Sequence, residues 1–156
     1  VTADGSGALN HRIVAMLKSA NQFAELATVF KNYRIKSCLV QYMPWDPQQQ
    51  GSAAMQISLV DDDDQVWTGS QGYGGDHYTY EDSKVFQVSK PWQVKVPYPG
   101  NSPWKGVDTD AYTGTPDADA EAVEVKAYST ATFTASETLG HLFFKWQVEF
   151  KNFSFR

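Results

Sequence analysis

The apolar residues near the C-terminus of the chain alternate with polar ones over a long stretch. From Leu142 to Phe150 an apolar side chain stands at every second position, which is the period of a β-strand with one buried face. These positions are Leu142, Phe144, Trp146, Val148 and Phe150. We therefore expect a long, aromatic strand that closes the fold.

A second segment, near the N-terminus, changes its period along its length. The apolar residues of 21–32 fall at i, i+3, i+4 and i+7, which is one face of a helix, and Asn21 is a suitable N-cap. They are Phe23, Leu26, Ala27 and Phe30. Residues 33–43 then show a strand period that ends at the Pro44-Trp45-Asp46-Pro47 breaker. We predict a short helix that leads directly into a long strand.

Shorter strands are expected between these two segments. Met55, Ile57 and Leu59 alternate with polar residues, and residues 85–88, 92–98 and 121–135 also have strand character. The pattern of 11–18 fits a strand or a helical turn. Seven or eight strands with one helix and no βαβ alternation predict an all-β sandwich or barrel, and eight strands in two antiparallel sheets make a jelly roll.

Length and composition limit the class of protein. The chain has 156 residues, enough for one domain, and we expect a flexible N-terminal arm at 1–8 followed by the folded domain at 9–156. The net charge of -5 argues against strong nucleic-acid binding by charge alone. No apolar run approaches the length of a membrane span, so we expect no membrane partner. The single cysteine, Cys38, excludes an intramolecular disulfide and fits a buried structural thiol.

Catalytic patterns are missing from the sequence. The three histidines, His11, His77 and His141, are not spaced to bind a metal together, and no Gly-x-Ser-x-Gly elbow occurs. The Gly-rich run at 72–75 follows no predicted strand and precedes no helix, so it is not a phosphate loop. We therefore assign no catalytic residue.

The strongest local charge feature is the run Asp61, Asp62, Asp63 and Asp64. Four adjacent carboxylates repel one another unless something offsets them, and calcium prefers such oxygen ligands. A solvated strand end is the alternative reading. Three tryptophans, Trp45, Trp67 and Trp104, lie in predicted loops, where they suit either a sugar-stacking platform or a protein interface. Trp92 and Trp146 lie on apolar strand faces and are expected in the core.

Several of these segments resemble small icosahedral virus capsid proteins. The helix-to-strand run from Phe23 to Ile35, the Tyr42-x-Pro44 corner and the aromatic strand after Gly140 look like the shell domains of tombusvirus- and sobemovirus-like coat proteins. Comparable jelly rolls occur in some small circular single-stranded DNA viruses. The resemblance implies an eight-stranded jelly roll with a short helix before the third strand, and calcium held between subunits by the acidic loop. The family's usual Arg/Lys-rich arm has no counterpart in residues 1–8.

The expected function is therefore structural. The chain would assemble with copies of itself into an icosahedral shell around a single-stranded RNA or DNA genome, and so would be found in the virion. Arg12, Lys18 and Lys31 would face the nucleic acid, and Trp45, Trp67 and Trp104 would lie at subunit interfaces. Two alternatives remain at this point. One is a calcium-dependent carbohydrate-binding β-sandwich that uses the loop tryptophans, and the other is a jelly-roll enzyme.

Overall fold

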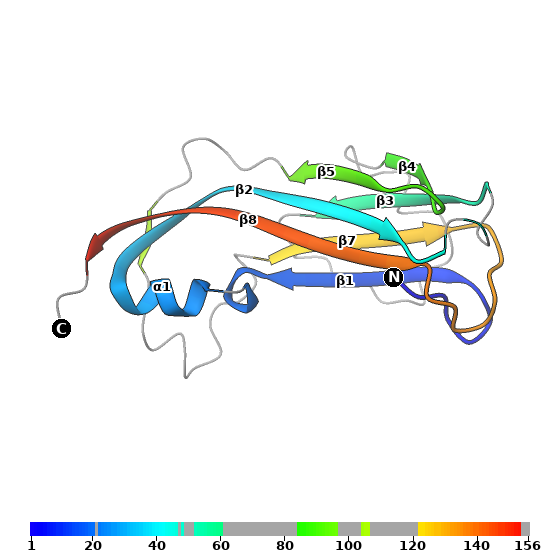
Figure 1. Cartoon of the computed structure of the whole chain (residues 1–156), viewed down its shortest axis with the longest axis horizontal. Helices are drawn as coiled ribbons and strands as arrows, with labels where there is room; N and C mark the ends of the chain where they lie inside the picture. The colour runs from blue at the N-terminus through cyan, green and yellow to red at the C-terminus, as the bar shows by residue number, and fades with distance from the viewer. Residues whose placement is uncertain are drawn as a thin grey trace.

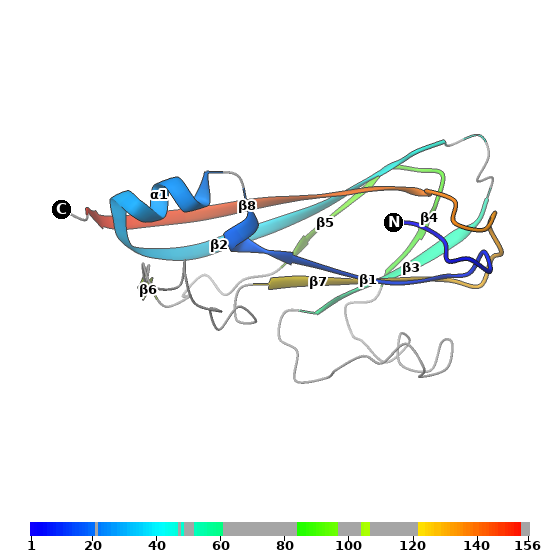
Figure 2. The same cartoon turned by 90° about the horizontal axis from the view of Figure 1, so that it is seen from below.

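Two antiparallel sheets pack face to face in the structure, a computed structural model. It describes residues 1–20, 22–46, 48, 52–60, 84–96, 104–106 and 122–153. The first sheet has the order β1 (Leu9–Met16), β7 (Ala122–Ser129), β3 (Ala54–Val60) and β4 (Lys84–Gln87). The second is built on β2 (Phe30–Pro44), which pairs with β8 (Gly140–Phe153), β5 (Trp92–Val96) and β6 (Lys105–Gly106). Figure 2 shows β2 and β8 in one layer and β1 and β7 in the other.

The predicted all-β architecture is thus confirmed, and the described residues include the predicted short α-helix. Among the described residues, seven strands have four or more residues, and β6 contributes only a two-residue pairing. The segment 11–18, which the sequence left open, forms the end of β1 and a 3-10 turn at Leu17–Ser19. No helix of the described residues is long and apolar enough to cross a membrane.

The helix α1 (Phe23–Val29) is shorter than predicted and stands in a different place in the strand order. It precedes the second strand of the described chain rather than the third, because β1 is the only strand before it. It ends early because Phe30 and Asn32 already pair with β8, and this pairing requires extended backbone. Its N-cap is Gln22, which has a left-handed backbone (φ 70°) and no side-chain capping bond.

The long strands β2 and β8 pair from Phe30–Phe153 to Pro44–Gly140, the most extensive pairing in the fold. They run past the ends of β1 and β7, and α1 lies beside this extension (Figure 1). The register shifts by one residue between Ile35 and Ser37, which is a β-bulge. Because of the bulge, the side chains of β2 that face the core have odd residue numbers before Lys36 and even residue numbers after it.

Two buried clusters result from this geometry. The larger lies between the sheets and includes Cys38, Val40, Tyr42, Met55, Ile57 and Val125, each at most 1% exposed. The smaller lies under α1 and joins Leu17, Tyr33 and Ile35, with Phe23 and Phe150 against it. Trp146 packs against both clusters. The predicted core positions of Cys38, Trp92 and Trp146 are confirmed.

The segment predicted as a flexible arm, residues 1–8, lies along the turn that precedes β8. The Ala3 N–H donates to the Glu137 carbonyl at 2.9 Å, and Thr2 forms an isolated bridge with Thr138. The Phe133 N–H donates to the Gly7 carbonyl at 2.8 Å, and Gly7 has a positive φ of 81°. The division into an arm and a shell domain stays a prediction.

Candidate functional site

Exposed apolar side chains gather at the two ends of the ribbon formed by β2 and β8. At the α1 end these are Leu26, Val29 and Phe153, which are 39%, 44% and 59% exposed. At the opposite end they are Met43, Trp45 and Phe143, which are 53%, 68% and 54% exposed. Water-exposed apolar groups in clusters are typical of surfaces that bind other proteins. Both ends are therefore candidate contact surfaces between subunits.

The α1 end is held together by aromatic packing. The Phe30 ring lies between two rings of β8, at 5.4 Å from Phe150 and 4.8 Å from Phe153 between ring centroids. Phe23 of α1 makes an edge-on contact with Tyr33 at 5.3 Å. These contacts fix α1 on the strands, so the exposed side chains of this end are presented on a rigid support.

The opposite end places Trp45 directly after β2. The Trp45 N–H donates to the Leu139 carbonyl at 3.0 Å, and its ring meets His141 edge-on at 5.4 Å. Of the predicted interface tryptophans, Trp45 is thus exposed and Trp104 half-buried, whereas Trp67 lies outside the described residues. Their role at interfaces stays a prediction.

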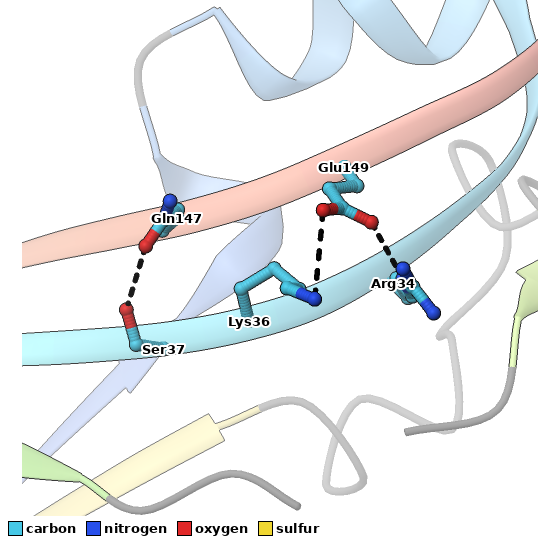
Figure 3. A network of polar contacts seen from close by, with 5 residues as sticks. All are labelled: Arg34, Lys36, Ser37, Gln147 and Glu149. Atoms are coloured by element: carbon cyan, nitrogen blue, oxygen red, sulfur yellow. Dashed lines mark hydrogen bonds and ion pairs between the residues drawn. The ribbon is translucent and has the colours of Figure 1, made fainter. Parts of the chain in front are cut away.

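The outer face of the β8–β2–β5 sheet carries a polar network centred on Glu149 (Figure 3). Arg34 Nε donates to Glu149 Oε2 at 2.6 Å, and Lys36 Nζ lies 3.5 Å from Oε1 of the same carboxylate. The hydrogen bond from Arg34, followed by the positive charges of Arg34 and Lys36, lowers the pKa of Glu149. Arg34 is paired with Glu149, and Lys36 stands two residues further along β2 on the same face, so both cations reach one carboxylate.

The other predicted site residues are placed as follows. Lys31 is exposed at the start of β2. Arg12 pairs with Lys126 in the β1–β7 ladder, and Lys18 lies in the 3-10 turn. The run Asp61, Asp62, Asp63 and Asp64 lies outside the described residues, and within the described part of the chain no group of three or more His, Cys, Asp or Glu side chains could hold a metal.

Sequence reasoning missed the Glu149 network and the exposed Met43 and Phe143. Arg34 and Glu149 are 115 residues apart, so only the strand pairing brings them together. Phe143 carried a usable signal, because it stands between the inward-facing Leu142 and Phe144 and must point outward.

Three solved structures share this fold over almost the whole chain. A capsid protein deletion mutant of Penaeus vannamei nodavirus, in a T=1 subviral particle, has a TM-score of 0.67 and 14% identity, with 99% of this chain and 91% of that chain covered. Mud crab tombus-like virus gives 0.68 and 11%, with 99% and 81% covered. Cocksfoot mottle virus gives 0.67 and 12%, with 98% and 89% covered.

At these identities the likeness establishes the fold, which is that of small icosahedral virus capsid jelly rolls. No protein-family model and no curated protein matches the chain.

Proposed function

We propose that this chain is the subunit of a viral capsid, a structural protein without catalytic activity that assembles into a closed icosahedral shell. The observation that carries the proposal is the match of nearly the whole chain to capsid proteins of three kinds of virus, at TM-scores of 0.67–0.68. A match to a short shared motif would carry far less weight. The eight-stranded jelly roll is part of the proposal, with β6 counted among its strands.

The surface of the sandwich suits repeated self-association. Exposed apolar side chains stand at both ends of the long β2–β8 ribbon, with Leu26 and Phe153 at one end and Trp45 at the other. A subunit that offers two separate contact surfaces can bind two neighbours at once, and weak contacts repeated around a closed shell add up to a stable particle. This arrangement favours a shell over a carbohydrate-binding module.

Three finer parts of the proposal concern partners and location. The shell encloses a single-stranded RNA or DNA genome, and the protein is located in the virion. Calcium bound by Asp61, Asp62, Asp63 and Asp64 between subunits acts as a latch, since carboxylates without their cation repel one another. Trp45, Trp67 and Trp104 contribute to the interfaces between subunits.

Assembly is tested directly by negative-stain electron microscopy and light scattering of the purified protein. Closed particles of uniform size are the expected result. A monodisperse monomer across a range of salt and protein concentrations would show that the proposed function is wrong. The calcium latch is tested separately on assembled particles, and it is wrong if a chelator at mildly alkaline pH leaves the particle size unchanged.

A further inference from the structure

The outer face of the β8–β2–β5 sheet has a charge opposite to that of the whole chain. Among its described residues it presents five cationic side chains and one carboxylate, Glu149, although the chain as a whole carries a net charge of -5. The cations are Arg34, Lys36, Lys95, Lys145 and Lys151. We call this surface the basic face.

The outward direction of the basic face follows from the core. On β2 the side chains of Cys38 and Val40 are fully buried, so Leu39 between them points outward. Leu39 pairs with Lys95 on one side and with Lys145 on the other. The three strands therefore place the two lysines in one row across the sheet, and both are exposed.

These two lysines have no counter-charge within the described part of the chain, since neither forms an ion pair there. Within the described part of the chain, the ion pair of Arg34 uses only one of its guanidinium nitrogens. Its bond to Glu149 uses Nε, and the two terminal nitrogens of the guanidinium are not part of that bond. One carboxylate thus offsets at most part of the charge, and the face keeps an excess of positive charge.

An aromatic ring lies among these cations. The Trp104 ring has Arg34 at 4.6 Å and Lys151 at 4.1 Å from its centroid, both within cation–π distance. Further along β8 the Phe143 ring is 54% exposed on the same face, opposite Gln41 of β2. Basic side chains interleaved with aromatic rings are the combination by which proteins bind single-stranded nucleic acid without reading its sequence.

We infer that the basic face binds the phosphate backbone of single-stranded nucleic acid. The inference rests on the proposed shell function, because it names the surface of the subunit that would contact the enclosed genome. It differs from the sequence-based expectation, which assigned this contact to Arg12, Lys18 and Lys31. Phosphates bind by charge along the row formed by Lys95 and Lys145, and Arg34, held by Glu149 and Trp104, provides a positioned donor at one end.

The test is the binding of a fluorescently labelled single-stranded oligonucleotide, followed by anisotropy at several salt concentrations. The double variant Lys95→Gln/Lys145→Gln removes two unpaired charges. Each phosphate contact to a single strand contributes about 0.7 to the slope of log K against log salt, so the slope falls by about 1.4 and affinity at 0.1 M salt falls about 25-fold. The matched control, Lys84→Gln/Lys90→Gln, removes two exposed lysines of the β4 region and is expected to bind like the wild type.

Equal loss in the two double variants would overturn the inference, because binding would then follow net charge and not this face. Binding of polyglutamate in place of the oligonucleotide would overturn it as well, since the occupant would be an acidic polypeptide. Particle formation is measured in parallel. If no particles form but the Lys95/Lys145 variant alone loses binding, the basic face is correct and the proposed shell is wrong. If particles form and the two double variants bind the oligonucleotide alike, the proposed shell is correct and the basic face is wrong.

Discussion

The Tyr42 hydroxyl links β2 to the segment after β4 and to the segment before β8. The side chain is fully buried, and its oxygen lies 3.0 Å from the Val88 carbonyl and 2.8 Å from the Leu139 carbonyl. Burial raises the pKa of Tyr42, so the hydroxyl stays protonated and donates at any ordinary pH. The Tyr42→Phe substitution removes this donor and keeps the ring, which stacks on Trp92 at 5.4 Å.

The expected loss in the free energy of unfolding follows from the hydrogen bonds that each carbonyl keeps after the substitution. The two carbonyls share the single hydroxyl hydrogen and both lose it, but Leu139 still accepts from the Trp45 N–H at 3.0 Å, whereas Val88 keeps no other donor among the described residues. Leaving one buried acceptor without its bond costs about 1–3 kcal/mol, and we expect about 1.5 kcal/mol after the gain from removing a buried hydroxyl. With a urea m-value of about 2 kcal/mol/M, the unfolding midpoint falls by about 0.7 M.

The measurement is urea unfolding of the dissociated subunit, followed by tryptophan fluorescence. Tyr33→Phe is the matched control, because Tyr33 is also buried but its hydroxyl has no hydrogen bond among the described residues. We expect the control to change the free energy of unfolding by less than about 0.5 kcal/mol. Equal midpoints for the two variants would refute the reasoning, since the loss would then come from changing any buried tyrosine.

Three further outcomes are expected. Gly140→Ala should destabilise the subunit by about 3 kcal/mol or prevent folding, because the added Cβ would lie 2.4 Å from the fixed ring of Tyr42; a variant that unfolds like the wild type in urea contradicts this close approach. Burial raises the pKa of Cys38 to about 12, so a thiol reagent at neutral pH should label it only after unfolding, and rapid labelling of the folded subunit would refute its burial. The pKa of Glu149 is lowered in the folded state, so its ion pair stabilises the fold above the ordinary carboxyl range and loses this effect as the pH falls through the lowered value. In an NMR titration, Arg34→Gln should move the Glu149 midpoint upward, and an unchanged midpoint would exclude Arg34 as the cause.

Strands that bury only one of their two faces were predicted well from the sequence. In β8 the alternation from Leu142 to Phe150 matches the inward side chains, and in β3 the buried Met55 and Ile57 match their predicted positions. The period is informative there because one face meets the core and the other meets water. In β1 the apolar residues Ile13 and Val14 are adjacent, so no single period stands out and the strand could not be assigned.

The candidate site was harder to predict because it depends on pairing between distant segments. The contact between Arg34 and Glu149 requires the register of β2 with β8, in which these two residues are paired. The helix start was predicted at Asn21 from capping preference, whereas Gln22 occupies the cap without a side-chain bond and Phe23 packs against Tyr33. The predicted calcium ligands lie outside the described residues, and that hypothesis still needs its own test.

The extra residue in β2 lets one strand contribute side chains to two buried clusters, which Trp146 also links. On one side of Lys36 the strand serves the cluster under α1, and on the other side it serves the cluster between the sheets. Strict alternation through Lys36 would turn one of the two apolar sets toward water, and the bulge prevents this by absorbing one residue. The bulge at Lys36 therefore lets one strand serve two buried clusters that a regular strand of the same sequence could not serve together.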